Sequence, residues 1–145
     1  PVTTDGFYLH EKGEDVCFIA TGFMVHTAFK IAEKVRESGF KVGIIDIFDL
    51  TNFSNEKLKE VLESYSRVVS MEEGFSGRGG LDSMLFEFIA KNKLDLKALS
   101  VGVEPGYSFE LGSREELHEK VGIGVQSALK KIQPFMRTII NEIKE

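Results

Sequence analysis

The sequence predicts an α/β fold, a three-layer α/β/α sandwich built on a five-stranded, mostly parallel sheet. Short apolar runs that do not alternate with polar residues recur along the chain, and such runs are typical of strands buried on both faces. Segments with helical periodicity separate them, which indicates right-handed crossovers between parallel strands. The runs are VCFIA (16–20), VGIIDI (42–47), VVSM (68–71) and ALSVGV (98–103).

The fifth strand is expected at the beginning of the chain, in FYLHEKGEDVCFIA (7–20). Two strand-like runs flank Lys12-Gly13 there, and this arrangement predicts an antiparallel hairpin. The hairpin would add one antiparallel strand to the four parallel ones.

Three helices are expected between the strands, each with an apolar stripe at helical spacing. Gly39 is positioned to end the first helix, and Ser54 or Asn55 to cap the start of the second. The stripes are Val25, Ala28, Phe29, Ala32 and Val35, then Leu58, Val61, Leu62 and Tyr65, then Leu81, Met84, Leu85, Phe88 and Ile89.

Two more helices are expected after the last strand. Ser113 and Glu116 form a capping-box pattern before a short helix that Gly122 ends. A long amphipathic segment then runs from about Gly124 to Lys144, and Pro134 interrupts it. Because proline lacks the N–H of an interior helical residue, we expect a kink or two helices meeting at Pro134.

Composition narrows the class of protein. The 145 residues fit one domain, 1–145, and the net charge of −5 argues against a nucleic-acid or anionic-membrane surface. No apolar run approaches the roughly 18 residues of a membrane span. The single cysteine fits a reducing, cytoplasmic setting, and Cys17 itself is expected to pack in the core. A chain that begins with proline suggests a split subunit or a fragment of a larger enzyme.

The glycine-rich stretch EEGFSGRGG (72–80) raises the question of a bound phosphate. A P-loop would need Lys and Ser or Thr where Gly80 and Leu81 stand, and a dinucleotide fingerprint would need glycine where Asp82 stands. The favoured interpretation is a structural or interface turn in which glycines adopt positive φ. Arg78 remains a candidate anion contact at a helix N-terminus.

Acidic residues and a histidine fall near the carboxyl ends of the predicted strands, where open α/β sheets place their sites. Solvated loop acids are the favoured interpretation, and a Mg²⁺ site is the alternative. His26 is the histidine of most interest because a substrate or a neighbouring domain could reach it beside Gly22, although an exposed first-turn residue is the simpler interpretation. The acids are Asp46, Asp49, Glu72, Glu73 and Glu104.

Three segments, in order, carry a resemblance to a known family. GEDVCFIATGFMVHTAFKIAEKV (13–35) has an apolar strand, A-x-G and a helix with paired alanines. RVVSMEEGFSGRGGLDSML (67–85) has a strand ending in a glutamate pair and a variable loop before Gly-Gly. GYSFELGSREELHEKVGI (106–123) has an aromatic residue, Gly-Ser and a capped helix. Together they resemble the C-terminal domain of transketolase-like, thiamine-diphosphate-dependent enzymes over nearly the whole chain.

The resemblance implies an accessory domain. In that family thiamine diphosphate and Mg²⁺ are held in other domains by a G-D-G…N motif, and this chain has no G-D-G. We therefore expect no catalytic, cofactor-binding or metal-binding residue here, a role in homodimer and domain assembly, and no nucleic-acid or membrane partner. The turns at Thr51–Ser54 and at Asp82 depart from the family pattern. The branch stays open among transketolase, the 2-oxoacid dehydrogenase beta subunit and deoxyxylulose-phosphate synthase.

Three functional hypotheses follow, and the last of them is a pure assembly subunit with no enzymatic partner. The first is the accessory domain, with interface or anion contacts expected at His26, Glu72, Arg78, Gly79 and Gly80. The second is an independent α/β module that binds a nucleotide, a flavin or Mg²⁺ at the carboxyl edge of its sheet.

Overall fold

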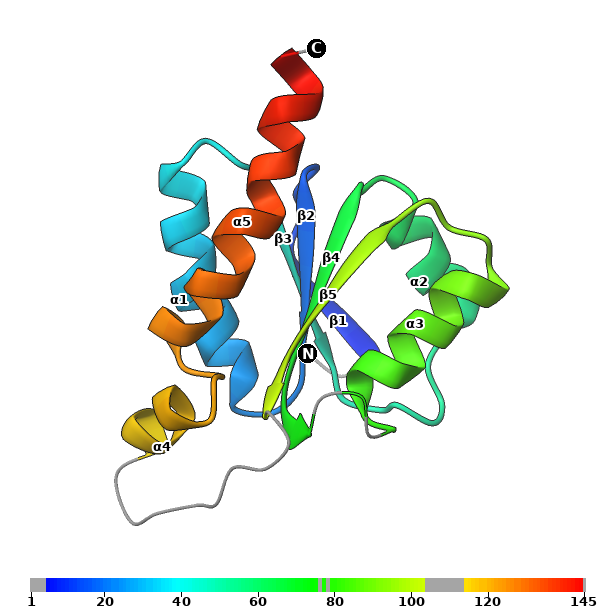
Figure 1. The fold of residues 1–145 in the computed structure, drawn as a ribbon. Coiled ribbons are helices and arrows are strands. Elements are labelled where there is room, and N and C mark those ends of the chain that lie inside the picture. Colours follow the sequence, from blue (N-terminus) through cyan, green and yellow to red (C-terminus); the bar gives the residue numbers. More distant parts are fainter. Residues whose placement is uncertain (1–4, 76, 78, 104–113, 145) are drawn as a thin grey trace.

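The computed structural model describes residues 5–75, 77, 79–103 and 114–144 (Figure 1). Strands and helices alternate along most of the chain, as the sequence predicts. The strands are β1 (Phe7–Glu11), β2 (Val16–Ala20), β3 (Val42–Ile47), β4 (Arg67–Phe75) and β5 (Lys97–Val103). The helices are α1 (Met24–Glu37), α2 (Asn55–Leu62), α3 (Leu81–Lys91), α4 (Arg114–Lys120) and α5 (Val125–Lys144).

The described residues form a five-stranded sheet in the order β1-β3-β2-β4-β5. Strands β3, β2, β4 and β5 pair in parallel, and β1 pairs antiparallel with β3. The predicted mixed sheet with one antiparallel strand is therefore confirmed. All five residues of β2 are buried, because this strand lies in the middle of the sheet and is covered on both faces.

The predicted hairpin is wrong, because β1 pairs with β3 rather than with β2. The segment between β1 and β2 instead packs against the backbone at the start of β3. Backbone N–H groups of Glu14 and Asp15 donate to the carbonyl of Lys41, at 3.3 and 3.0 Å. A Cβ on Gly13 would lie 2.4 Å from the carbonyl carbon of Val42, so only glycine can pass this close to the β3 backbone.

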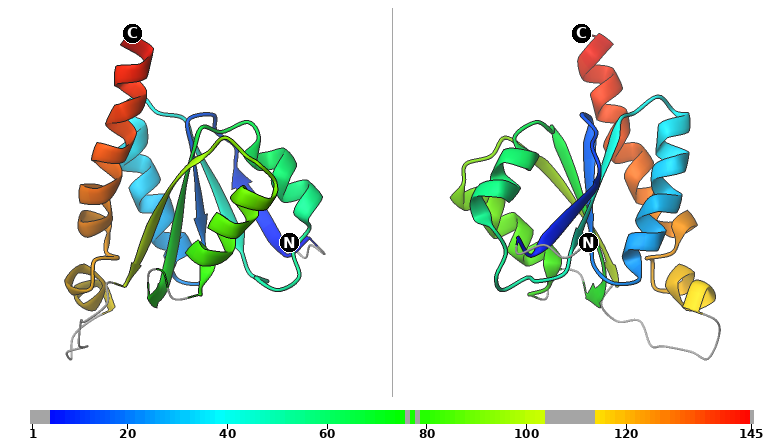
Figure 2. Two further views of the ribbon diagram at one scale, coloured as in Figure 1. Left: turned by 45° about the vertical axis from the view of Figure 1, so that its right-hand side comes forward. Right: turned by 180° about the vertical axis from the view of Figure 1, so that it is seen from behind.

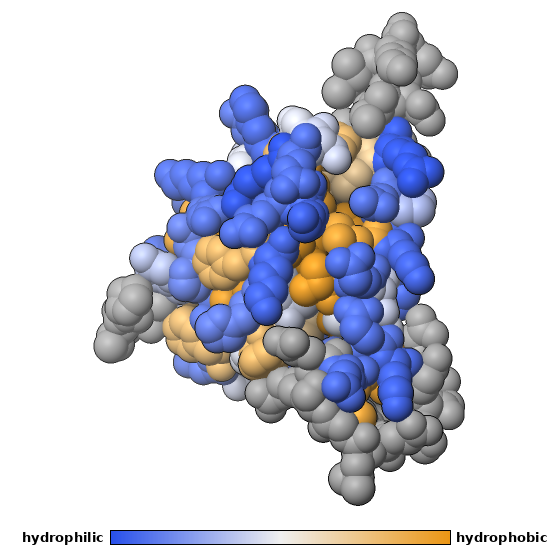
Figure 3. Space-filling model, turned by 90° about the vertical axis from the view of Figure 1, so that its left-hand side faces the viewer, coloured by the Kyte–Doolittle hydropathy of each residue, from blue (hydrophilic) through white to orange (hydrophobic). Residues whose placement is uncertain are grey.

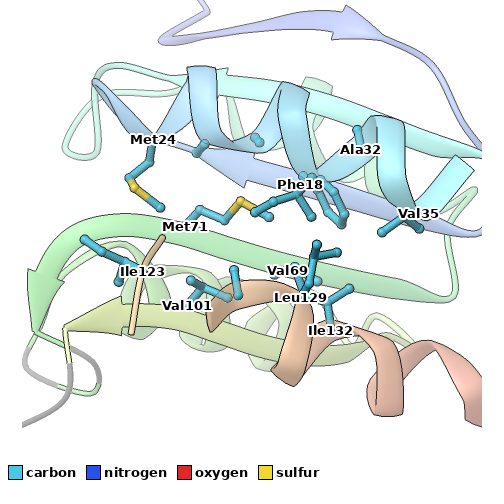
Figure 4. Close-up of a cluster of buried hydrophobic side chains, with 14 of the residues drawn as sticks. Phe18, Met24, Ala32, Val35, Val69, Met71, Val101, Ile123, Leu129 and Ile132 are labelled. Carbon is cyan, nitrogen blue, oxygen red and sulfur yellow. The ribbon is translucent and has the colours of Figure 1, made fainter. Parts of the chain in front are cut away.

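The helices cover the sheet on both faces and make three layers (Figures 1 and 2). Helices α1 and α5 lie on one face, and α2 and α3 lie on the other. Each face has its own apolar core. Figure 4 shows the core beneath α1 and α5, where Phe18 and Val69 of the sheet meet Val35, Leu129 and Ile132 of the helices.

Helix ends follow the predicted signals. Gly39, with φ of +91°, follows the end of α1, and the Ser54 side chain accepts from the N–H of Lys57 at the start of α2. Gly122 follows α4 with φ of +89°. Ser113, half of the predicted capping box, lies outside the described residues.

Of the two arrangements expected at Pro134, a kink or two helices, the structure does not have the second, because α5 is one helix that contains Pro134. The buried side chain of Arg67, at the start of β4, anchors α5 at this point. Its Nε donates to the carbonyl of Phe135 at 3.2 Å, and its guanidinium lies 5.6 Å from the centre of the Phe135 ring. This contact holds α5 against the sheet next to the residue that lacks a backbone donor.

Candidate functional site

The candidate site lies at the carboxyl edge of the sheet, where the strand order changes direction. The chain passes from β2 outward to β3 and then crosses back to β4, so the segments after β2 and β4 separate at this edge. Open α/β sheets place their ligand sites at such a point. The N–H of Thr21 donates to the carbonyl of Met71 at 3.2 Å and marks where the two strands end side by side.

Glu72 and Glu73 are neighbours near the end of β4, and successive strand residues point to opposite faces of a sheet. Glu72 is buried, and its Oε2 accepts from the N–H of Leu81 at 2.8 Å. A carboxylate suits this place because the N-terminus of α3 carries partial positive charge. Within this chain, Glu72 therefore contacts helix α3 and not solvent.

Gly80 makes room for this carboxylate. A Cβ at Gly80 would lie 2.5 Å from Oε2 of Glu72, well inside contact distance. The other carboxylate oxygen, Oε1, is buried and has no hydrogen-bond partner among the residues that the structure describes. Glu72 thus occupies the position at the helix N-terminus that an external anion would need.

Asp82 fixes the glycine-rich loop through hydrogen bonds to its carboxylate. It is buried, and its carboxylate accepts from the hydroxyl of Ser100 and the N–H of Gly77, each at 2.7 Å, and from the N–H of Ser83. Burial by itself would raise the pKa of Asp82, but these hydrogen bonds favour the charged form and leave the pKa below its ordinary value.

The glycine-rich loop directs backbone donors toward acceptors of the same chain. Gly77 and Gly79 have φ of +71° and +84°, which confirms the prediction that glycines adopt positive φ here. The N–H of Gly77 donates to Asp82, and that of Gly79 donates to the hydroxyl of Ser83 at 3.1 Å. Arg78, the candidate anion contact, lies outside the described residues.

On the opposite face, Glu73 meets a histidine that sequence reasoning missed. Nε2 of His118, from α4, lies 3.0 Å from Oε2 of Glu73, and the His118 side chain is only 8% exposed. The ring of Phe23 packs edge-on against the ring of His118, with ring centres 5.5 Å apart. The ring centre of His26 lies 5.7 Å from that of Phe23. Phe23 thus lies between a buried and an exposed histidine.

These aromatic rings line a cavity of about 300 Å³ between the start of α1, α4 and the start of α5. The carboxylate of Glu119 lies in its lining and accepts from the N–H groups of Gln126 and Ser127, at 3.0 and 3.1 Å. The N-terminus of α5 is thereby capped from within the chain. The cavity offers aromatic surface and the exposed imidazole of His26 to a contacting group.

The remaining acids of the predicted cluster do not converge on this place. Asp46 lies 3.8 Å from His10, and Asp49 accepts from the hydroxyl and N–H of Thr51, which lower the pKa of Asp49. Glu104 lies outside the described residues. In the part of the chain that the structure describes, no three His, Cys, Asp or Glu side chains are grouped to hold a metal ion.

The single cysteine is part of the core. Cys17 is fully buried on β2, and burial raises the pKa of its thiol well above the ordinary range. Its predicted packing role is confirmed, because a buried thiol without a nearby cation is a poor nucleophile. Among the described helices, none is long and apolar enough to cross a membrane.

Comparisons with known proteins agree with this geometry. Residues 7–127 match the family described as "Transketolase, C-terminal domain". The 1-deoxy-D-xylulose-5-phosphate synthase of Chlamydia abortus is 31% identical over 124 residues, which are 86% of this chain and 19% of the synthase. The chain therefore spans only a small part of the curated relatives it matches.

Two solved structures share the fold. A split-gene transketolase, described as an inactive beta4 tetramer, superposes with a TM-score of 0.77 at 24% identity, over 94% of this chain and 43% of that one. The transketolase of Campylobacter jejuni superposes with a TM-score of 0.68 at 20% identity, over 90% of this chain and 19% of that one.

Proposed function

Because the chain belongs to the transketolase C-terminal domain family, we propose that it is the accessory domain of a thiamine-diphosphate-dependent enzyme. In this proposal it contributes to domain and dimer assembly, while thiamine diphosphate and Mg²⁺ bind in other domains or in a partner subunit. The parent enzyme makes or rearranges a sugar phosphate by transferring a two-carbon unit. The relatives named as deoxyxylulose-phosphate synthases favour this reaction over oxidative decarboxylation of a 2-oxoacid.

The observation that carries the proposal is that the backbone N–H groups that a phosphate would need already donate to side chains of the same chain. The N–H groups of Gly77, Gly79 and Leu81 already donate to Asp82, Ser83 and Glu72. A diphosphate at this loop would have to displace two carboxylates of the same chain. Hydrogen bonds within the chain thus fix the conformation of the loop, which suits a turn at a domain or subunit contact.

We place the contact with the catalytic part of the enzyme at the carboxyl edge. His26 is exposed in the first turn of α1 and lies in the lining of the cavity beside Phe23. Gly79 is exposed at the tip of the glycine-rich loop, and Glu72 and Gly80 fix that loop from inside. Arg78, next to Gly79 in sequence, completes the proposed contact. We extend the proposal to a cytoplasmic location, which a chain with a single, buried cysteine fits.

A calorimetric titration tests the absence of a cofactor site in this chain. Thiamine diphosphate with Mg²⁺, Mg²⁺ alone, NAD and FMN are each titrated into residues 1–145, and thermal unfolding is measured with the same ligands. We expect no heat of binding and no thermal shift. A ligand present at 100 times its dissociation constant would add about 2.7 kcal/mol and be seen easily. Binding of NAD, FMN or Mg²⁺ would instead support the independent ligand-binding module.

A second measurement tests the assembly role directly. The chain is mixed with the part of the same enzyme that carries the G-D-G…N motif, and two-carbon transfer is assayed with and without it. We expect activity to need both parts and His26→Glu to weaken their association about tenfold or more. Lys59→Glu, on α2 at the far side of the sheet, is the matched control. Full activity without this chain would contradict the proposal.

A further inference from the structure

A groove lies between the C-terminal half of α1 and the middle of α5, on the face opposite α2 and α3. Its volume is about 310 Å³. The buried side chains of Val35, Leu129 and Met136 line it, and the half-buried ring of Phe40 adds an aromatic surface. Figure 3 shows apolar residues gathered between hydrophilic ones on this side of the molecule.

The polar lining of the groove comes from both helices. Lys34 and Ser38 are four residues apart at the end of α1, and Gln133 and Arg137 are four residues apart on α5. Residues at this spacing lie on one side of a helix, so each helix brings one cation and one neutral hydrogen-bonding group to the groove. All four residues are exposed. Among the residues that the structure describes, no acidic side chain lines the groove.

A neighbouring hollow shows what a neutralised surface looks like in this chain. Phe40 lines that hollow as well, and the cations there have carboxylate partners. Arg36 pairs with Glu11, and Lys41 lies 3.2 Å from Glu14. The positive charges on that side of Phe40 are therefore matched within the chain.

The two cations of the groove are not matched in this way. No hydrogen bond or ion pair joins Arg137 to another described residue. Lys34 lies 3.9 Å from Glu37, but both side chains are more than half exposed, so solvent screens this pair. The chain as a whole has a net charge of −5. Two positive charges beside an apolar surface are thus a local feature, and they suit an anion.

We propose that this groove binds a small amphipathic anion, with an apolar body of about two rings that carries one carboxylate or similar oxyanion. A cavity of about 150 Å³ accommodates benzene, so about twice that volume suits a two-ring body. The apolar body packs on Phe40, Leu129 and Met136, while Lys34 and Arg137 approach the anionic group from the two helices. An apolar lining with a few polar groups is the usual composition of a ligand pocket.

This inference goes beyond the proposed function, because the groove lies at the opposite end of the sheet from the candidate site. Helix α1 follows Phe23 at the carboxyl edge and runs back to Ser38, near the start of β3 at Val42 (Figure 1). A ligand in the groove would contact two helices on one face of the sheet and leave the carboxyl edge accessible. Its binding would stabilise the folded domain.

Nuclear magnetic resonance of residues 1–145, labelled with nitrogen-15, tests the proposal with naphthalene-1-acetate, its neutral amide and acetate. We expect naphthalene-1-acetate to shift the backbone resonances of residues 34–40 and 129–137. Its dissociation constant should be on the order of a millimolar or below, as suits a ligand of about 14 non-hydrogen atoms. The amide should bind about fivefold more weakly because it lacks the charge. Acetate should not shift these resonances because it lacks the apolar body.

One substitution and a matched control separate the local cation from net charge. Arg137→Gln should weaken the binding of naphthalene-1-acetate about threefold or more and leave that of the amide unchanged. Lys130→Gln makes the same change of charge at an exposed position of α5 outside the groove, and it should alter neither affinity. The dispersion of the backbone resonances establishes that each variant is folded.

Several results would overturn the proposal. Equal binding of the acid and the amide would mean that the cations take no part, and an equal loss in Lys130→Gln would mean that only net charge matters. Shifts confined to other residues, or no shift at about 10 mM ligand, would exclude the site.

A calorimetric titration of the chain assembled with the catalytic part of the enzyme completes the test. We expect naphthalene-1-acetate to bind the assembled enzyme as it binds the chain. Loss of binding there would overturn the proposal, because a neighbouring domain and not a ligand would then occupy the groove. The accessory role is tested separately by the cofactor titration and the two-part activity assay.

Discussion

At the scale of single residues, the two adjacent glutamates of β4 have different roles, because neighbouring residues of a strand point to opposite faces of the sheet. Glu72 caps α3 on one face, and Glu73 pairs with His118 of α4 on the other. Each carboxylate ties one helical layer to the carboxyl edge of the sheet. Both carboxylates thus have partners within the domain, whereas His26 is exposed and can contact another domain or subunit.

The fit between Gly80 and Glu72 can be tested by substitution. Gly80→Ala brings a methyl group within 2.5 Å of the Glu72 carboxylate, so we expect it to lower the free energy of unfolding by about 1–3 kcal/mol. In a Glu72→Ala background the same change should cost at least about 1 kcal/mol less, because the clash is absent. Urea denaturation measures all four proteins.

Gly74→Ala is the matched control, because its added methyl would lie 3.4 Å from the same carboxylate oxygen. It should show no such dependence on Glu72. Equal costs of Gly80→Ala in both backgrounds would mean that the carboxylate moves aside freely.

Asp82 makes stability depend on pH in a predictable direction. Its pKa is lowered in the folded chain, because hydrogen bonds to the carboxylate outweigh burial. The stabilisation is therefore complete above the unfolded pKa of about 4 and is lost as pH falls through the folded pKa. Asp82→Asn should be less stable by about 1–3 kcal/mol at pH 7, and this gap should shrink between about pH 5 and 2. A gap that stays constant in urea denaturation across this range would contradict the assignment.

At the scale of elements, the position of β1 depends on one glycine. Gly13 passes against the backbone of Val42 and Gly43, and its N–H donates to the hydroxyl of Tyr65 at 2.9 Å. Gly13→Ala would push this crossing away from β3, and backbone atoms cannot yield as a side chain does. We expect a loss of about 2–4 kcal/mol in unfolding free energy, measured by chemical denaturation. Lys12→Ala, at the exposed neighbour, should stay within about 0.5 kcal/mol of the native sequence.

The elements also show which features of a sequence predict structure. The runs at 16–20 and 42–47 predict buried strands correctly, because each needs only its own apolar residues to be recognised. The partner of β1 is not predictable in the same way, because a third segment, β3, inserts between two runs that are adjacent in sequence. Pro134 is similar: the residue predicts an interruption, whereas the side chain that anchors the helix, Arg67, lies 68 positions before its partner Phe135.

The candidate site follows the same rule. The positions of Glu72 and His26 at the carboxyl edge could be predicted, since strand ends and helix starts are local features. His118 could not, because it is separated from Glu73 by 45 positions and no ligand spacing links them. The internal use of the loop donors by Asp82 and Ser83 also depends on contacts that only the folded chain creates.

At the scale of the whole molecule, Cys17 is a natural reporter of global opening. It lies in the central strand and is fully buried, so a reagent cannot reach it. Its pKa is also raised, so little of the reactive thiolate forms. We expect an aromatic disulfide reagent to label it at a rate that follows the population of the globally unfolded chain as urea is added. Ser38→Cys, at an exposed helix end, should react at once in the same assay. Labelling of Cys17 in native buffer faster than global unfolding would reveal local opening of the sheet.

The strand order β1-β3-β2 has a consequence for how the chain folds as it leaves the ribosome. Strand β1 precedes the other four strands of this sheet in sequence, but its neighbour in the sheet is β3, which ends at Ile47. Until that residue has emerged, β1 has no native partner, and the adjacent β2 is the nearest strand with which it can pair wrongly. The native pairing of β1 therefore waits until β3 has emerged, whereas β2 is available for wrong pairing earlier.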